Sequence, residues 1–353
     1  MALNADNQQI TPPNSNGRLR VFDALRGFSM LSVVYMHVLL GAGIGSYSTV
    51  SGSIVMGWFM PLFFFISGFF SYKPLHKWNR ATIGIQLSQK VKALLISTII
   101  FYGLLSYVHG GNILGWLNNG FRWYWFTPVL FQMYLLYIIA VCISFVAKRD
   151  ASLFLMIIIT VLLWFVKDNI YLNSTPWWPV INGAAICYYI QWFVTGLIVR
   201  RYHGKILKWL DLDAVKAILI LGYVVLLCIT LAKNDSMHPV IQNIASLAIS
   251  YFGVFLLYML FYQARKFFDG DSRVARGLCF TGQRTLDIYM IHYFFVPAFP
   301  VIGAWLEPNS MVLFQLLYGL STAVIITTIS LIISWAIRTC PILADWCLGV
   351  RGR

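Results

Sequence analysis

Two polar residues, Arg26 and His37, stand eleven positions apart in the first long apolar stretch of the chain. Eleven residues make about three turns of α-helix and a rise of ~16 Å, so both side chains are expected on nearly the same helix face. A guanidinium binds phosphates through forked hydrogen bonds, and a neutral imidazole accepts a proton from a hydroxyl. An arginine inside a membrane helix costs about 2.5–3.5 kcal/mol. The pair therefore predicts a polar cavity behind that face.

The composition is that of a polytopic membrane protein. Of 353 residues, 59% are hydrophobic, 16% aromatic and only 11% charged. A hydrocarbon core of ~30 Å needs about 20 apolar residues per helix, so we expect an all-α bundle of about ten transmembrane helices. The expected spans are residues 22–42, 54–72, 91–108, 124–147, 151–166, 180–199, 214–232, 239–263, 282–302 and 311–337.

The net charge of +14 is explained by topology. Lys and Arg collect before the first span and in alternate loops, as at Arg18 and Arg20, Lys73 to Lys92, Lys148 and Arg149, and Arg200 to Lys208. This is the positive-inside pattern, and with ten spans it places both termini in the cytoplasm. We expect a multi-pass protein of the cell's inner (plasma) membrane in contact with anionic lipids, with no nucleic-acid partner.

The chain is expected to contain one membrane domain. Residues 1–17 are polar and include Pro12 and Pro13, which predicts a disordered cytoplasmic lead-in. The membrane domain is expected at 18–340, followed by a short cytoplasmic tail at 341–353. The six cysteines include no CxxC pair, so we expect no metal site.

Four sequence blocks resemble the membrane acyltransferase family three. The first is Asp23-Ala-Leu-Arg26-Gly27, followed by His37, and its spacing is the most specific element. The other blocks are an aromatic-rich segment ending in Ser67-Gly68-Phe-Phe, the segment Trp123-Tyr-Trp125-Phe, and Gly282-Gln-Arg-Thr-Leu-Asp287-Ile-Tyr289-Met-Ile-His292. They occur in the family's order across nearly the whole chain.

The resemblance implies an O-acyltransferase that uses cytoplasmic acyl-CoA, with acetyl-CoA as the expected donor. The acceptor would be a hydroxyl of a glycan or lipid-linked glycan at or beyond the outer membrane face. Relatives often carry an Arg-x-x-Arg pattern in the basic loop before the third span. Here that loop contains Gln89-Lys90-Val91-Lys92, so its role in CoA binding is not carried over.

Within this framework, Arg26 is expected to meet the donor phosphates and His37 to act as the general base. Alternatively, His37 carries the acyl group covalently before transfer. Asp23 lies three residues before Arg26 and could orient it or favour the helix dipole. Structural alternatives are an Arg26 that snorkels to lipid phosphate and a His37 packed against a neighbouring carbonyl.

Supporting roles are expected for residues of the other blocks. Ser67 and Gly68 would admit a CoA arm or simply another helix. Asp287, Tyr289 and His292 are candidate supporting residues, with Tyr289 and His292 on one face. Trp123 and Trp125 would either anchor the protein at the outer interface or contact the acceptor.

Two functions from other classes remain open at this point. A transporter or flippase for a glycan or acyl substrate would use buried Arg, Asp and His as a substrate or proton path. A non-catalytic scaffold for glycan assembly would leave the Arg26 and His37 pair unexplained. Residue types alone do not select the acceptor sugar, the hydroxyl, the acyl length or the oligomeric state.

Overall fold

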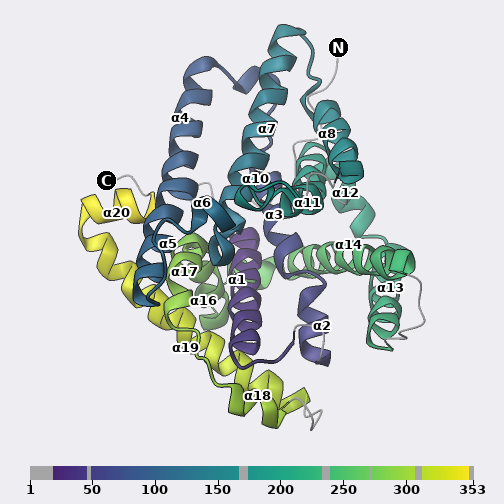
Figure 1. The fold of residues 1–353 in the computed structure, drawn as a ribbon. Coiled ribbons are helices and arrows are strands. Elements are labelled where there is room, and N and C mark those ends of the chain that lie inside the picture. Colours follow the sequence, from purple (N-terminus) through teal and green to yellow (C-terminus); the bar gives the residue numbers. More distant parts are fainter. Residues whose placement is uncertain are drawn as a thin grey trace. The chain divides into compact units, whose positions relative to one another are not determined.

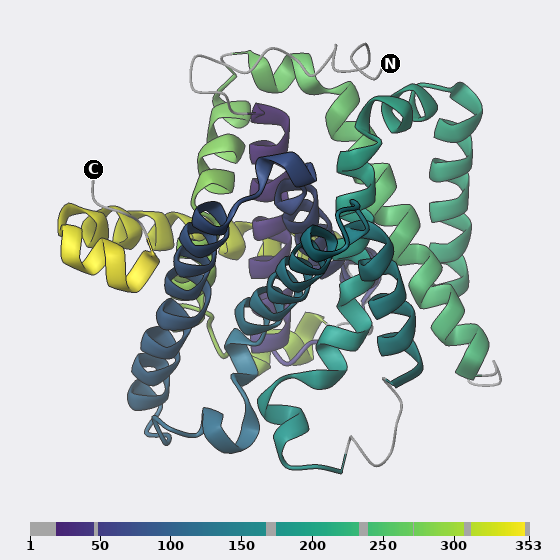
Figure 2. The same ribbon diagram turned by 90° about the horizontal axis from the view of Figure 1, so that it is seen from above.

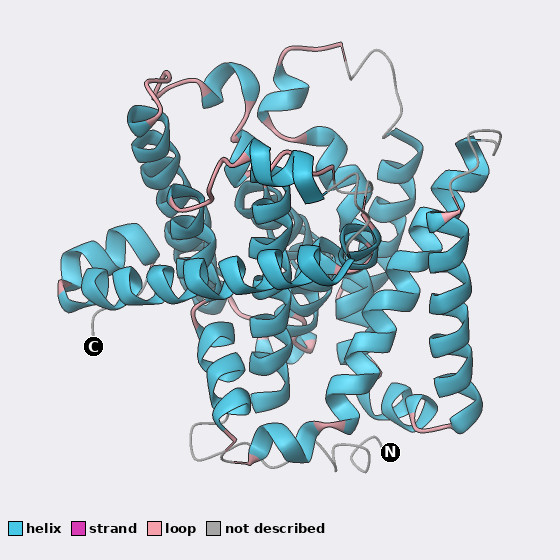
Figure 3. Ribbon diagram, turned by 90° about the horizontal axis from the view of Figure 1, so that it is seen from below, coloured by secondary structure: helices cyan, strands magenta, loops and turns pink. Residues whose placement is uncertain are grey.

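The computed structural model describes residues 19–45, 49–166, 174–232, 239–270, 272–306 and 312–349. Within these ranges the protein is helical and contains no strand (Figure 3). The all-α prediction is therefore confirmed. The lead-in expected at residues 1–17 lies outside the described residues, as do the last four residues of the expected tail.

The helices are labelled in Figure 1. Those of the first half are α1 (Arg20–Gly41), α2 (Val50–Met56), α3 (Phe59–Ser71), η1 (Leu75–Lys77), α4 (Arg80–Lys90), η2 (Val91–Ile96), α5 (Ser97–Val108), α6 (Trp116–Asn119), η3 (Arg122–Tyr124), α7 (Phe126–Val146) and α8 (Ser152–Val166). Those of the second half are α10 (Trp177–Val180), α11 (Gly183–Arg201), α12 (His203–Leu210), α13 (Asp213–Leu231), α14 (Pro239–Gln263), α15 (Arg265–Asp269), α16 (Arg273–Gln283), α17 (Thr285–Ile291), η4 (His292–Phe294), α18 (Pro300–Leu306), α19 (Val312–Thr339) and α20 (Pro341–Leu348).

Eight helical stretches of the described residues are long and apolar enough to cross a membrane. They correspond to eight of the ten expected spans. The stretch expected at 151–166 is α8, an apolar helix of 15 residues. The polytopic helical architecture is thus confirmed.

The prediction of one continuous helix at 282–302 was wrong. Helix α16 ends at Gln283, α17 runs only from Thr285 to Ile291, and η4 follows as a 3₁₀ turn. Pro297 and Pro300 explain why no helix continues beyond η4, because proline lacks an N–H and disfavours helical geometry in the residue before it. The chain resumes as α18 at Pro300.

The contacts divide the chain into two units. The first comprises the described parts of residues 1–63, 202–288 and 295–331, and the second those of 64–201, 289–294 and 332–353. In the first unit, α1 is the enclosed helix: 67% of its most apolar stretch is buried, against 6% for α13. The apolar side chains of α13 face outward, as expected for a lipid-facing helix.

Helix α1 makes its most extensive packing contact with α16, and the two lie side by side in Figure 1. Two glycines permit this approach. A Cβ added to Gly27 would overlap the carbonyl oxygen of Leu278, and one added to Gly282 would overlap that of Asp23. Small residues let membrane helices approach backbone to backbone, where dispersion contacts replace the hydrophobic effect. The close crossing of α1 and α16 therefore requires glycine at both positions.

In the second unit, α4, η2 and α5 form one long helical rod, the dark blue element of Figure 2. The basic stretch expected as a loop before the third span is thus helical, which corrects that prediction. Residues 91–96 form a π-helix, a widening that often marks functional positions. Helix α20 packs on it: Lys92 Nζ lies 2.6 Å from Asp345 Oδ2, and a Cβ on Gly349 would crowd the Ala93 Cα.

We expect Gly282→Ala to lower the apparent unfolding midpoint of the detergent-solubilised protein. The added methyl overlaps a backbone oxygen that cannot rotate away, and overpacking of this kind costs about 1–3 kcal/mol. Gly277→Ala is the matched control on the same helix, because a Cβ there meets nothing within 4 Å. It should raise the midpoint slightly, since alanine is favoured over glycine by about 0.5–1 kcal/mol in a helix. Equal midpoints for the two variants would contradict the close crossing.

Candidate functional site

Helix α1 carries Arg26 and His37 on one uninterrupted helix of 22 residues. The eleven-residue spacing therefore corresponds to about three turns and ~16 Å, as the sequence predicted. Both side chains are half-buried, whereas Gly27, Ser29, Met30 and residues 32–36 between them are buried. The two polar groups thus occupy partly open positions, as the apolar Phe28 and Leu31 also do, on a helix that is otherwise mostly buried.

Asp23 lies one turn before Arg26 and is buried. Its Oδ2 accepts a hydrogen bond of 3.1 Å from Gln283 Nε2, at the end of α16. The glycine crossing brings Gln283 to this point, because Gly282 packs against the Asp23 backbone. A buried carboxylate needs such a donor. Gln283 was missed by the sequence analysis, although it directly follows a glycine of the fourth block.

Asp287 has an ion-pair partner at the break between α16 and α17. Its Oδ2 lies 3.9 Å from Arg284 Nη1, and only 2% of the residue is exposed. An acid in the first turn of a helix also interacts favourably with the helix dipole. Both residues belong to the first unit, whereas His292 belongs to the second. Asp287 thus has Arg284 as an ion-pair partner within its own unit.

Tyr289 connects two of the sequence blocks within the second unit. Its hydroxyl donates to the Trp123 carbonyl at 3.3 Å and accepts from the Phe126 N–H at 3.3 Å. Phe126 begins α7, and the first N–H groups of a helix have no partner within it. Tyr289 therefore caps α7 with a side chain that lies 163 positions away in the chain.

His292 is fully buried and opens the 3₁₀ turn η4. Its ring centroid lies 4.2 Å from that of Tyr293 and 5.9 Å from that of Tyr289. The rings of Tyr289 and His292 therefore lie close to each other, and a shared role for them stays a prediction. Tyr124, a residue without an expected role, is also buried here and donates to the Met290 carbonyl at 2.8 Å. This bond holds the last turn of α17 just before His292.

The third sequence block, Trp123-Tyr-Trp125-Phe, is here called the tryptophan block. Its first tryptophan is exposed, its second is half-buried, and the tyrosine between them is buried. Trp123 is 39% exposed, and Trp125 is half-buried and stacks on Tyr189 with centroids 5.2 Å apart. Interfacial anchoring explains exposed rings but not the buried Tyr124 between them. The block therefore has a structural role inside the second unit in addition to any contact at its surface.

Ser67 and Gly68 lie on α3, where it crosses α11. A Cβ on Gly68 would overlap the Phe193 carbonyl, and one on Gly196 would overlap the Phe65 carbonyl. Helix packing therefore accounts for the glycine. Ser67 is half-buried, and its carbonyl accepts from Ser71 Oγ at 2.7 Å. A contact of Ser67 and Gly68 with the donor stays a prediction.

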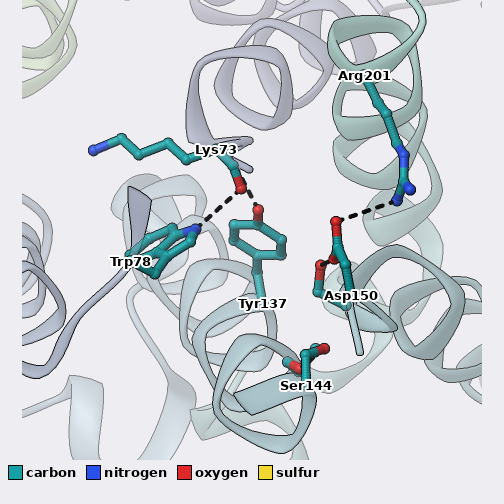
Figure 4. A network of polar contacts seen from close by, with 8 residues as sticks. Lys73, Trp78, Tyr137, Ser144, Asp150 and Arg201 are labelled. Carbon is teal, nitrogen blue, oxygen red and sulfur yellow. Dashed lines mark hydrogen bonds and ion pairs between the residues drawn. The ribbon is translucent and has the colours of Figure 1, made fainter. Parts of the chain in front are cut away.

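Several basic residues expected on the cytoplasmic side take part in a polar network of the second unit (Figure 4). The Lys73 N–H donates to Tyr137 Oη at 3.4 Å, and Trp78 Nε1 donates to the Lys73 carbonyl at 3.1 Å. Arg201 Nη1 lies 3.7 Å from Asp150 Oδ2. The Lys73 ammonium lies 5.5 Å from the centroid of the Trp78 ring, over its face. The network joins the chain after α3 to α7, and the loop before α8 to the end of α11.

We expect Tyr289→Phe to lower the unfolding midpoint, because the change removes the hydroxyl that caps the Phe126 N–H and bonds the Trp123 carbonyl. A buried polar group left without a partner costs about 1–3 kcal/mol. Tyr107→Phe is the control, since Tyr107 is 72% exposed. Differential scanning fluorimetry in detergent compares the two variants with the wild type. A Tyr289→Phe midpoint equal to that of the control would exclude the capping role.

A comparison with known protein families relates this arrangement to a known activity. The model of an acyltransferase domain, acyltransferase family 3, matches residues 19–339. Searches of curated proteins and of solved structures found no match. The family match includes all four blocks and every candidate residue described above. The chain therefore belongs to this acyltransferase family and is a multi-pass membrane acyltransferase.

Proposed function

We propose that the protein transfers an acyl group, acetyl in the first instance, from cytoplasmic acyl-CoA to a hydroxyl of an extracytoplasmic glycan. The protein would act in the inner (plasma) membrane. Arg26 binds the donor and His37 is the general base. The observation that carries this proposal is that Arg26 and His37 are half-buried polar residues three turns apart on the largely buried helix α1. Membership of the acyltransferase family supplies the reaction class.

The chemistry assigns one task to each side chain. The Arg26 guanidinium pairs with the phosphates of CoA by charge-assisted bonds. Neutral His37 takes the proton of the acceptor hydroxyl as its oxygen attacks the thioester carbonyl, forming a tetrahedral intermediate. The intermediate collapses to the ester and expels the CoA thiolate, which accepts a proton to become the thiol. In the covalent variant, an unprotonated imidazole nitrogen of His37 attacks first and the acyl-imidazole is then cleaved by the hydroxyl.

The packing around α1 supports a fixed position for the donor-binding residue. Gly27 directly follows Arg26 and is locked against α16, and Asp23 is held by Gln283. A backbone that is already fixed need not be ordered when Arg26 binds a ligand, which supports a binding role for this residue. We also propose supporting roles for Asp23, which is bonded by Gln283, and for Asp287, which pairs with Arg284.

The transporter or flippase alternative has one structural argument in its favour. Transporters often bind substrate at interrupted helices, and the chain is interrupted between α16 and α17 and again after η4. An acyltransferase leaves a labelled acyl group on the acceptor, whereas a transporter moves its substrate unmodified. The two functions therefore separate in one labelling experiment.

We expect His37→Ala to reduce transfer from labelled acetyl-CoA to surface glycan by about 10²–10⁴-fold, because a general base contributes that factor. Arg26→Ala should raise the donor KM, since a charge-assisted bond contributes about 1.5–3 kcal/mol. The measurement uses membranes that contain each variant at equal level. His76→Ala is the matched control, because His76 is an exposed histidine on η1. It should transfer at the wild-type rate.

Full transfer by His37→Ala would exclude the general-base role. Label that never reaches a glycan, while glycan export depends on the protein, would favour transport instead. Label retained on the protein itself at neutral pH is measured in parallel, because an acyl-imidazole is hydrolysed in acid. Label that appears only when His37 is present indicates the covalent variant.

A further inference from the structure

Trp123 combines an exposed ring with a firmly held backbone. Its carbonyl accepts a hydrogen bond from the buried Tyr289, while 39% of the residue is exposed. The next residue, Tyr124, is fully buried and bonded to Met290. The indole is therefore presented on a rigid base. Aromatic rings held in this way bind ligands at low entropic cost, because few rotatable bonds are left to be fixed.

A cation lies over this ring. The Arg122 guanidinium carbon is 5.7 Å from the centroid of the Trp123 ring, and the His109 ring is 6.1 Å from it. Arg122 is exposed. The segment from His109 to Trp125 contains no Asp or Glu. The surface formed by His109, Arg122 and Trp123, here called the Arg-Trp surface, is thus aromatic and positively charged.

The expected topology makes this charge unusual. The loop between α5 and α7 is one of those expected outside, where the positive-inside pattern leaves few basic residues. An interfacial anchor needs aromatic rings but gains no topological advantage from an arginine there. The positive charge is explained if it meets an anion carried by the substrate. A guanidinium fits a carboxylate or phosphate by two parallel hydrogen bonds.

We propose that the Arg-Trp surface recognises an acidic sugar of the acceptor. The indole of Trp123 covers the apolar face of the sugar ring, and Arg122 binds its carboxylate. Because cation and ring are adjacent, the surface selects a sugar with an acidic group next to its stacking face. This proposal rests on the proposed function, since it assumes a glycan acceptor at the outer side of the membrane. It narrows that acceptor to an acidic glycan class.

The test measures equilibrium binding of a labelled oligogalacturonate and of its carboxyl-reduced, neutral counterpart to the purified protein in detergent. We expect the wild type to bind the acidic form more tightly. Arg122→Gln should weaken binding of the acidic form about tenfold and leave the neutral form unchanged, as expected for the loss of one charge-assisted contact. Arg122→Lys keeps the charge and should retain part of the preference. Trp123→Ala should weaken both forms.

Lys208→Gln is the matched control, because it removes one exposed positive charge from α12. It should bind both probes like the wild type. Equal binding of the two probes by the wild type, or an acidic preference that survives Arg122→Gln, would overturn the proposal. Loss of the acidic preference on adding phosphatidylglycerol micelles would also overturn it, because Arg122 would then be a lipid-phosphate anchor.

The binding test of the Arg-Trp surface and the acyl-transfer test of the proposed function can fail independently of each other. Acyl transfer to glycan without any acidic preference in binding would contradict the Arg-Trp surface and leave the proposed function standing. Arg122-dependent binding of the acidic probe without any acyl transfer would support the surface and count against the acyltransferase mechanism at His37.

Discussion

The backbone contact between α1 and α16 is the constraint on which the candidate site depends. Gly27 and Gly282 leave no Cβ between the two helices, so the carbonyls of Leu278 and Asp23 lie where side chains would otherwise be. In a membrane, such closeness is stabilised by dispersion between packed backbones, because lipid tails provide no hydrophobic driving force for helix association. Arg26 directly precedes one of these glycines, so its position is set by the crossing.

The four sequence blocks have distinct structural tasks that their chemistry alone does not reveal. The first and fourth blocks meet at the glycine crossing, where Gln283 also holds the Asp23 carboxylate. The fourth block then continues into the second unit, where Tyr289 caps α7 and bonds the Trp123 carbonyl. One short segment therefore contributes to the packing of both units.

Much of the fold could be predicted because it depends on local patterns. Apolar runs of about 20 residues mark helices in a membrane whatever their neighbours are, so eight expected spans appear as long apolar helices. The basic segments were harder to predict. Residues 80–90 and 273–281 lie between the expected spans and carry charge, so they were expected in loops, yet both are helical. Charge opposes membrane burial but does not oppose helix formation at an interface.

The sequence by itself determined the helical class, the spacing of Arg26 and His37 on one helix, and the family to which the chain belongs. These follow from composition, from the 3.6-residue period and from residue order. Only the tertiary structure decided that Gln283 bonds Asp23, that Tyr124 and Tyr289 fix the tryptophan block, and that Gly68 packs against Phe193. These contacts join residues far apart in the chain, and their formation depends on how helices cross, which local spacing does not encode.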